Sequence, residues 1–448
     1  GANQNITFNN VLIGDVYFMI GQSNVFYSMA EQIFDLSMKN MGSALSVDYN
    51  DSRNMRFYRI SSTDYVGMTG YAAQGTATEY VDVYNGGSWM LPSDVMNQIL
   101  LFSNYTPQSV MYDRNVISME VFSALGYIFA YNMTNLSEVP VGVIEIDAAG
   151  APLISFAPNA LASAWGHESY DAATQTYYYN LNGVITNPQL KSRYVYNQQI
   201  YPLKNFSTAG IIWYQGESDA FNLREVFGNL YTNSYAFQFT QLMTYYRSVF
   251  GNSDFPVYIM ELPACYDDSG TAAYMDIGGV RAEMGSIPQM LPNCHIVSSS
   301  DLWADTMWEN NIHPYIKHLN AIRLSAVVAM DKFGSYSPDA VKGPVLADVV
   351  YSDKIAYLAF NNVGTGLVTA DGTGYVKGLE ILILYNGAAT WIPYEGPVIA
   401  SANQLVINGG EFTVYGIRYN RSAEGIYPLT ANLCNSNGMP AISFIDLK

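Results

Sequence analysis

Residues 16–24 read VYFMIGQSN, an apolar run followed at once by glycine, glutamine, serine and asparagine. The apolar run is typical of a buried strand, and the residues after it can turn into a helix. The first backbone N–H groups of a helix lack intrahelical partners and point towards a developing negative charge. Gly21 lets the chain bend tightly. The pattern predicts a turn that presents Ser23 as a nucleophile, although Ser23 and Asn24 are also ordinary helix caps and the tetrapeptide alone is weak.

Two further segments carry the polar groups that such a serine needs. A serine hydroxyl requires a base to take its proton and donors to stabilise the oxyanion that forms. Residues 210–218, GIIWYQGES, read as an apolar strand that ends in polar residues, where open α/β sheets bind their ligands. Residues 310–314, NNIHP, supply His313, and Lys317 and a predicted helix follow. Histidine titrates near neutrality and can carry out both proton transfers of an ester hydrolysis.

Strand-like and helix-like stretches alternate up to about residue 335. The expected strands are residues 11–20, 140–146, 210–214, 256–261 and 295–299, and the expected helices are residues 119–131, 237–250 and 317–332. Such alternation argues for a parallel sheet with helices on both faces. We therefore expect an α/β fold in which Ser23, Gln215 and the His313 loop meet at one edge of the sheet.

The pattern changes after residue 338. Short β-branched or alternating runs are then separated by glycine-rich turns such as DGTG at 371–374 and NGG at 408–410. This predicts a small antiparallel β domain. A chain of 448 residues also exceeds one ordinary domain. We expect an esterase-type domain at 1–337 and a C-terminal β domain at 338–448.

Three ordered motifs resemble the sialate O-acetylesterase family of the SGNH hydrolases. They are GDV at 14–16 leading into GQSN, WYQGES at 213–218, and IHP at 312–314 with Lys317 and Arg323 downstream. Weaker similarity continues into the C-terminal third. The resemblance implies an SGNH-hydrolase-like (flavodoxin-like) parallel sheet with helices on both faces, plus a C-terminal antiparallel β domain. Family members commonly carry another β domain ahead of the catalytic one, which we expect to be missing here or removed.

The resemblance also assigns roles to residues. It makes Ser23 the nucleophile and His313 the general base that later protonates the leaving alcohol. It implies an oxyanion hole built from the backbone N–H groups of Ser23 and Gly150 and the side-chain amide of Gln215, each stabilising the transition state by on the order of 3 kcal/mol. Gly150 lies in DAAGAP, where the family usually shows a glycine pair after a tryptophan, and Phe156 replaces another family tryptophan. These departures bear on the shape of the acyl and sugar pockets.

The third member of a catalytic triad is left open. Many SGNH hydrolases carry an aspartate three residues before the histidine, and this chain has Asn310 there. Asparagine cannot balance an imidazolium charge, and the same replacement in serine proteases lowers turnover about ten-thousandfold. Either the site works as a Ser-His dyad or another acid serves. The candidates are Glu309, Asp305 and Asp301, with Glu217 as a supporting residue near Gln215; each is otherwise a solvated loop charge.

The remaining histidines and the tyrosine clusters have simpler interpretations. His167, His295 and His318 lie in no comparable motif, so we expect surface or packing roles for them. The tyrosines at 177–179 and at 194, 196 and 201 could stack on sugar rings, but core or interface packing is the favoured role. They would also suit self-assembly or assembly with other extracellular chains.

Composition excludes several classes of protein. Apolar content is 49% and charged content 13%, which is typical of a globular chain. The net charge of −18, from 20 basic and 38 acidic residues, argues against a nucleic-acid partner. No apolar stretch is long enough for a membrane span. No EF-hand or zinc signature is present, and the proposed chemistry needs neither metal nor cofactor.

Cysteine and glycosylation patterns bear on the compartment. Cys265, Cys294 and Cys434 are too scattered for a disulfide scaffold, although one disulfide and one free thiol would be compatible with them. Sequons occur at Asn5, Asn50, Asn104, Asn132, Asn135, Asn205 and Asn420. Together with the resemblance they favour a secreted or luminal protein, extracellular or lysosomal. No signal peptide is visible, and a mature chain beginning at Gly1 would have lost one.

The sequence therefore predicts a serine carboxylic-ester hydrolase that removes acetyl esters from sialic acid or a related glycan through an acetyl-serine intermediate. The expected partner is an O-acetylated carbohydrate, and a plant-type polysaccharide is the nearest alternative substrate. A different class stays open: a structural or glycan-binding extracellular protein that keeps the esterase-like fold with weak or no activity. Asn310 and the altered Gly150 segment motivate that alternative.

Overall fold

The computed structural model describes residues 10–38, 54–59, 87–101, 121–166, 168–171, 176–179, 192–220, 235–263, 277–302, 312–394, 401–421 and 431–448. Several residues named above lie outside these ranges, namely Asn5, Asn50, Asn104, His167, Cys265, Asp305, Glu309 and Asn310.

Helices and strands alternate through the first three quarters of the chain. In order they are β1 (Asp15–Gly21), α1 (Ser23–Phe26), α2 (Met29–Met38), β2 (Met55–Arg59), β3 (Ser88–Met90), α3 (Pro92–Leu101), α5 (Ala124–Ser137), β4 (Val141–Asp147), α6 (Asn159–Trp165), β5 (Glu168–Asp171), β6 (Thr176–Tyr179), β7 (Gly210–Tyr214), α7 (Glu217–Ala220), α8 (Tyr235–Val249), β8 (Val257–Met260), α9 (Ile277–Met290), β9 (Cys294–Val297), α10 (Lys317–Phe333) and α11 (Pro338–Val341). Short 3₁₀ or π turns occupy Leu153–Phe156, Tyr196–Ile200 and Tyr201–Leu203.

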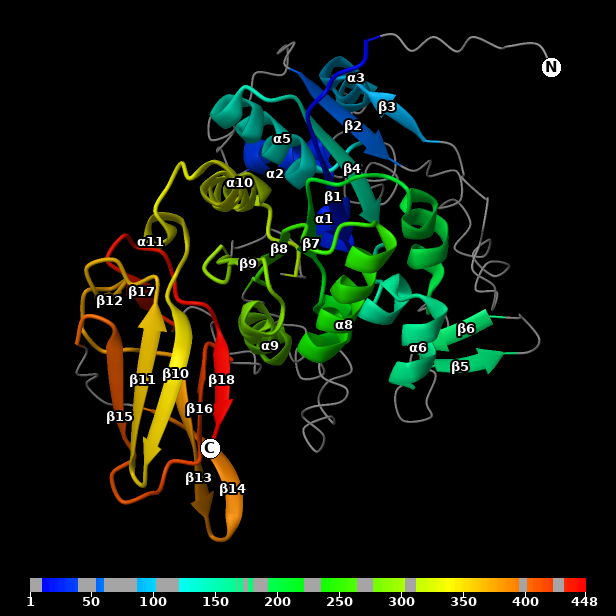
Figure 1. Cartoon of the computed structure of the whole chain (residues 1–448). Coiled ribbons are helices and arrows are strands. Elements are labelled where there is room, and N and C mark those ends of the chain that lie inside the picture. The colour runs from blue at the N-terminus through cyan, green and yellow to red at the C-terminus, as the bar shows by residue number, and fades with distance from the viewer. Residues whose placement is uncertain are drawn as a thin grey trace, which may run out of the picture.

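A seven-stranded sheet in the order β3-β2-β4-β1-β7-β8-β9 organises these elements. Its strand pairs are parallel except for β2 with β3. Helices α2, α5 and α10 lie on one face, and α6, α8 and α9 lie on the other (Figure 1). This confirms the expected α/β class with helices on both faces. The strand order reverses at β1, and sheets of this kind bind ligands beyond the carboxyl ends of the strands at that point.

Helices on both faces explain why the β1 sequence is continuously apolar. Successive strand residues point to opposite faces, and here each face is covered. Tyr17 meets Phe129 of α5 edge to face at 5.1 Å, whereas Phe18 meets Phe250, just beyond α8, at 5.2 Å. Every side chain from Tyr17 to Ile20 is fully buried.

Element bounds differ from the expected ones mainly at α5. The strand expected at 210–214 is β7, and the helix expected at 317–332 is α10 with one more residue. The helix expected from residue 119 begins instead at Ala124, because the Ser123 hydroxyl accepts a hydrogen bond from the Gly126 N–H at 3.3 Å and caps it. The predicted helix began too early because Val121 and Phe122 are apolar and buried although they precede the helix.

The C-terminal part is antiparallel throughout its described pairs. Its strands are β10 (Val345–Ser352), β11 (Ile355–Asn361), β12 (Leu367–Thr369), β13 (Leu379–Tyr385), β14 (Ala388–Pro393), β15 (Gln404–Asn408), β16 (Gly416–Tyr419), β17 (Leu433–Asn435) and β18 (Phe444–Leu447). They form sheets β10-β11-β15, β14-β13-β16-β18 and β12-β17. Leu358, Ile381 and Ile417 belong to a second hydrophobic core. The β region expected after residue 338 is thus confirmed as a fold class, and the predicted domain boundary falls just before α11.

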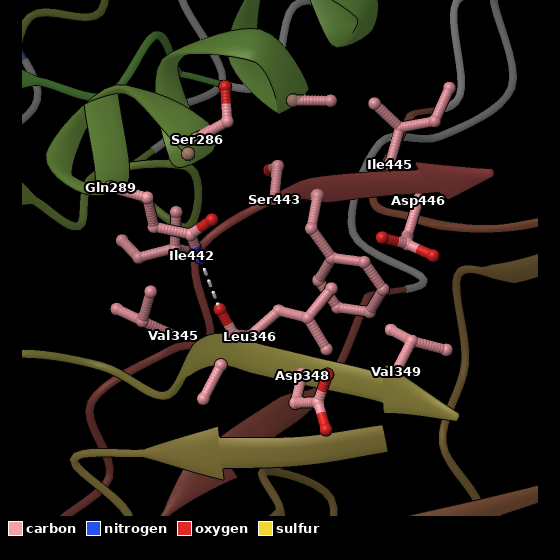
Figure 2. Close-up of a pocket in the computed structure, with 14 residues that line it drawn as sticks. Ser286, Gln289, Val345, Leu346, Asp348, Val349, Ile442, Ser443, Ile445 and Asp446 are labelled. Carbon is pink, nitrogen blue, oxygen red and sulfur yellow. Dashed lines mark hydrogen bonds between the residues drawn. The ribbon is translucent and has the colours of Figure 1, made fainter. Parts of the chain in front are cut away.

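A buried polar interface joins the C-terminal sheets to α9. Ser443 donates to Glu261 Oε1 through its N–H at 2.9 Å and its hydroxyl at 2.8 Å, and Arg281 Nε donates to the same hydroxyl at 3.0 Å. Beside this contact lies a cavity of about 180 Å³ between α9, β10 and β18 (Figure 2). Gln289 donates across it to the Leu346 carbonyl at 2.9 Å. None of the motif residues lines this cavity.

Several smaller expectations can be compared with the structure. Tyr194 and Tyr196 are buried, which fits packing. Asn420, which lies in one of the sequons, is buried, and its amide donates to the Ser443 hydroxyl at 3.1 Å. Asn135 and Asn205 are exposed. Among the described helices, none combines the length and apolarity needed to cross a bilayer.

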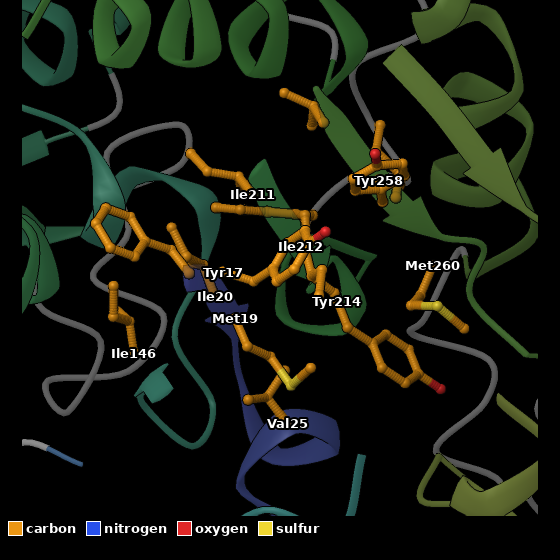
Figure 3. Packing of buried hydrophobic residues seen from close by; sticks show 14 of the residues in the cluster. Tyr17, Met19, Ile20, Val25, Ile146, Ile211, Ile212, Tyr214, Tyr258 and Met260 are labelled. Carbon is orange, nitrogen blue, oxygen red and sulfur yellow. The ribbon is translucent and has the colours of Figure 1, made fainter. Parts of the chain in front are cut away.

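The core around β1 and β7 supports the predicted nucleophile turn. Side chains of β1, β4 and β7 pack together, and Val25 of α1 lies beside Met19 of β1 (Figure 3). Fully burying one large apolar side chain stabilises the fold by roughly 1.5–3 kcal/mol. The short helix α1 is therefore anchored by its own apolar residues immediately after β1 ends.

Candidate active site

The serine stands at the turn from β1 into α1. Gln22 N–H donates to the Tyr214 carbonyl at 3.3 Å, which keeps the turn against the end of β7. A Cβ on Gly21 would lie 2.1 Å from that carbonyl oxygen and 2.6 Å from Val25, so this close approach requires glycine. Ser23 is half-buried, whereas its neighbours Gln22 and Asn24 are buried. The fold therefore leaves Ser23 partly exposed at the strand end.

His313 lies against this serine. Its Nε2 is 2.7 Å from Ser23 Oγ, across 290 positions of sequence. When the imidazole is neutral with Nε2 unprotonated, the hydroxyl donates to it, which is the arrangement a general base requires. The half-buried ring keeps access to solvent. The structure thus brings together the two residues that the sequence paired.

The loop that carries His313 is held by side chains that bind its backbone. Asn24 Nδ2 donates to the Ile312 carbonyl at 2.8 Å, and Lys317 Nζ donates to the Pro314 carbonyl at 2.7 Å. Gln32 of α2 donates to the Tyr315 carbonyl and accepts from a backbone N–H at the start of α10. These contacts dock a loop from late in the sequence onto the first two helices.

Asn24 is the centre of a buried polar group beneath α1. Besides Ile312, its Nδ2 donates to Glu217 Oε1, and its Oδ1 accepts from Lys317 Nζ at 2.6 Å. The Lys317 ammonium also lies 5.0 Å from the centre of the Tyr27 ring. All three polar residues are buried.

Burial shifts the titration of both charged members. Loss of hydration raises the pKa of Glu217 to about 7, a shift that the Asn24 hydrogen bond opposes. Burial likewise lowers the pKa of Lys317 to about 7, a shift that the nearby Glu217 carboxylate opposes. Each group therefore depends on the other to remain charged near neutrality.

The side-chain amide of Gln215 forms hydrogen bonds within the fold. It is fully buried; its Nε2 donates to the Ala151 carbonyl at 3.0 Å and to Asp219 Oδ2 at 2.6 Å, and its Oε1 accepts from Tyr235 at 3.1 Å. The resemblance assigned this amide to the oxyanion hole, and that role stays a prediction. In this structure the amide holds the loop that follows β4 through its bond to Ala151.

Gly150 belongs to that loop and is half-buried. Its φ of +72° is left-handed, and among the described residues, its two chain neighbours apart, no atom lies within 4 Å of the position a Cβ would take. Ala148 N–H donates to the Gly21 carbonyl at 3.2 Å, which places this loop beside the serine turn. Within the described chain, the N–H groups of Ser23 and Gly150 have no hydrogen-bond partner. Over the described residues, one such donor therefore lies on Ser23 itself and the other on the loop bonded to the serine turn.

The acids considered for the third triad position have different surroundings. Both oxygens of Asp301 accept from Arg323, at 2.5 and 2.8 Å, so this carboxylate is already paired. Glu309 and Asp305 lie outside the described residues. Glu217 reaches the serine segment through Asn24, which fits a supporting residue. Over the described ranges, no cluster of three or more His, Cys, Asp or Glu side chains could hold a metal ion.

Sequence reasoning missed four residues of the site. Asn24 and Lys317 were quoted in motifs without a role, and their positions beside Ser23 and after His313 were the available signal. Asp219, four residues after Gln215, accepts from the Leu153 N–H at 3.0 Å. Gln32 carries no local signal, since only the folded chain brings it to the His313 loop.

Residues 111–314 match the family model described as carbohydrate esterase, sialic acid-specific acetylesterase. The match includes Gly150, Gln215, Glu217 and His313, and it begins after Ser23.

Relatives align over almost the entire chain. The sialate O-acetylesterase of Pongo abelii is 22% identical over 99% of this chain and 77% of its own length, and that of Mus musculus is 24% identical over 99% and 79%. A carbohydrate acetylesterase from Xanthomonas citri has a similar fold, with a TM-score of 0.66, 20% identity, and coverage of 97% of this chain and 80% of the other. These matches confirm the resemblance to the sialate O-acetylesterase family.

Proposed function

We propose that this chain, a carboxylic-ester hydrolase related to the sialate O-acetylesterases, removes O-acetyl groups from sialic acid or a related glycan through an acetyl-serine intermediate. The observation that carries the proposal is the 2.7 Å contact between Ser23 Oγ and His313 Nε2 at a half-buried position beyond the end of β1. Such a pair can activate a hydroxyl at neutral pH.

In the first half of the reaction, Ser23 Oγ attacks the acetyl carbonyl carbon while His313 Nε2 takes the hydroxyl proton. The carbonyl oxygen becomes an oxyanion, which the free N–H groups of Ser23 and Gly150 stabilise. The protonated imidazole then gives its proton to the sugar oxygen as the ester C–O bond breaks. The products are the sugar alcohol and acetyl-serine.

In the second half, water attacks the acetyl-serine while His313 takes a proton from it. The same two N–H groups stabilise the second oxyanion, and the imidazolium returns the proton to Ser23 Oγ as acetate leaves. Gln215 holds the loop that carries Gly150 through its bond to Ala151. Glu309 and Asp305 remain the candidate acids that would orient His313, and without either of them the site works as a dyad.

The test compares the chain with a Ser23→Ala variant on a chromogenic acetate ester. We expect the variant to fall to the rate of the imidazole-only background, a loss of about a thousandfold or more. A brief acid quench should also show an acetyl adduct on the peptide with Ser23. Equal rates for the two proteins would refute the esterase. Acetate release from O-acetylated sialic acid, compared with acetylated plant polysaccharide, then identifies the sugar.

A second candidate is a glycan-binding or structural extracellular protein with the same fold. The altered segment around Gly150, and an asparagine at position 310, favour it. It predicts binding of sialylated glycans with no acetate release from wild type. We also propose a secreted or luminal location, supported by the exposed sequons at Asn135 and Asn205.

A further inference from the structure

We propose that Asn24 and Lys317 form a positioning pair that fixes the separation of Ser23 and His313, a role that rests on the proposed function. Neither residue is assigned a role by the motifs. Both lie in the buried polar group beneath α1, out of reach of a substrate.

The pair holds the backbone on both sides of His313. Asn24 donates to the Ile312 carbonyl at 2.8 Å, and Lys317 donates to the Pro314 carbonyl at 2.7 Å. Asn24 is also the covalent neighbour of Ser23. One side chain therefore ties the nucleophile segment directly to the residue that precedes the base.

Lys317 determines which way the Asn24 amide faces. An ammonium can only donate, so the 2.6 Å contact with Lys317 Nζ requires the amide oxygen on that side. The amide nitrogen must then face the Ile312 carbonyl and Glu217, which both accept. Only a carboxamide of this length offers an acceptor and two donors in this arrangement.

Burial makes these contacts difficult to replace. Asn24 and Lys317 are both fully buried, so water cannot substitute for a lost partner. The ammonium is further stabilised by the Tyr27 ring at 5.0 Å and the Tyr214 ring at 5.7 Å. The positioning pair of Asn24 and Lys317, with its bonds to the backbone around His313, is called the clamp below. It is therefore a fixed part of the fold.

The expected consequence is a kinetic defect without a binding defect. Displacing a catalytic group by about 1 Å costs on the order of a hundredfold in rate. Since neither residue meets the substrate, KM should stay within about twofold while kcat falls.

The experiment uses Asn24→Asp and the double variant Asn24→Asp/Glu217→Gln in the full chain. The single change removes the donor to Ile312 and sets a carboxylate against Glu217. The second change removes that repulsion and supplies a donor, but it leaves the Ile312 carbonyl without its partner. We expect kcat on the chromogenic ester to fall about 10- to 100-fold in both variants, whereas Tm recovers only in the double variant.

Asn435→Asp provides the matched control. Asn435 is also fully buried, and its amide donates to the carbonyls of Lys342 and Asn362, both at 3.0 Å, in the C-terminal part of the chain. This variant should lose Tm with kcat unchanged. Lys317→Met should reproduce the kcat defect of Asn24→Asp, because it removes two contacts of the clamp.

A wild-type kcat in folded Asn24→Asp, or full recovery of kcat in the double variant, would overturn the proposal. If wild type is no faster than Ser23→Ala, the proposed function fails instead, and the clamp is then tested by NMR titration of the imidazoles. The chain has only four histidines, and His313→Gln assigns the relevant resonance. A His313 pKa that changes in Asn24→Asp but not in Asn435→Asp supports the clamp; no change in either overturns it.

Discussion

The two ends of α10 lie beside clusters of the same residue types, with different consequences. At its first turn, by the carboxyl edge of the sheet, Lys317 lies near His313 and Ser23. Near its last turn, Asp331 Oδ1 lies 3.0 Å from Nε2 of His295, whose Nδ1 is 2.8 Å from Lys342 Nζ. Both regions thus combine a histidine, a lysine and a carboxylate. The carboxylate is that of Glu217 at the first turn and that of Asp331 near the last.

The difference lies in what the imidazole nitrogens meet. Both nitrogens of His295 face charged groups, and its ring stacks on Tyr258 at 5.5 Å. No ring nitrogen is left for a reactant. His313 instead directs Nε2 at a half-buried hydroxyl. A histidine beside ionic groups is therefore not enough for catalysis, because one nitrogen must face a group that a substrate can reach.

The largest effect should come from changing each histidine in turn. His313→Gln removes the proton acceptor of Ser23, so kcat/KM should fall about ten-thousandfold or more with little change in Tm. His295→Gln should lower Tm and leave kcat/KM within about twofold. Steady-state kinetics on the chromogenic ester measure both. A large loss of activity in His295→Gln would contradict the conclusion that, of these two histidines, His313 alone takes part in the reaction.

The next effect concerns the free energy of unfolding, which Glu217 and His295 should make depend on pH with opposite signs. The Glu217 pKa is raised from 4.5 to about 7, so the folded chain holds a proton that the unfolded chain releases. This contribution to the free energy of unfolding is present below pH 4.5 and is lost as the pH rises to 7. At about 1.4 kcal/mol per pKa unit, the contribution is at most about 3 kcal/mol. Glu217→Gln should remove that decline.

His295 should show the opposite sign. Burial, and the charge of Lys342, lower its pKa below 6.5 in the folded chain. The unfolded chain binds the proton first, so stability is present above pH 6.5 and is lost as the pH falls through the folded pKa. Urea denaturation at a series of pH values measures both trends. If His295→Gln and wild type keep the same slope below pH 6.5, this assignment fails.

A smaller effect is expected at Lys342. Lys342→Met removes the donor to His295 Nδ1 and should lower the free energy of unfolding by about 1 kcal/mol. Activity should remain that of wild type. Chemical denaturation provides the measurement, and a kcat defect as large as that of Lys317→Met would show that the two ends of α10 are coupled.

The smallest effect is expected at the exposed ion pair of Asp301 with Arg323. Such pairs contribute at most about 1 kcal/mol, so Asp301→Asn should be nearly neutral in Tm and in kcat. The same variant tests the triad. A ten-thousandfold fall in kcat would make Asp301 the acid that orients His313.

Local patterns predicted the parts of the fold that local physics controls. The run at 16–20 is β1 because a strand covered on both faces must be apolar throughout, and the helix expected at 317–332 is α10 for the same reason of periodic burial. The predicted start of α5 was wrong because the helix begins only after Ser123, whose hydroxyl caps it, and the residues before Ser123 are buried without being helical. Apolar periodicity does not distinguish that stretch from a helix.

The pairing of Ser23 with His313 was predictable from the sequence, whereas the side chains that hold the two segments together were not. Ser23 and His313 stand in motifs whose chemistry is intrinsic to the side chains. The hydrogen bonds of the Gln215 amide within the fold were not predicted, since an amide can bond to a substrate or to its own fold equally well. Its acceptors Ala151 and Asp219 lie in other segments of the chain.

The sequence by itself determined a parallel sheet, a C-terminal β region and the candidate pair of Ser23 and His313, because strand burial, turn residues and the chemistry of single side chains are properties of short segments. Only the tertiary structure decided that a loop 290 positions away places Nε2 2.7 Å from the Ser23 hydroxyl. It also decided that Asn24 and Lys317 hold that loop while His295 lies between Lys342 and Asp331. The physical reason is that hydrogen bonds between distant segments exist only after the sheet has brought their strand ends together.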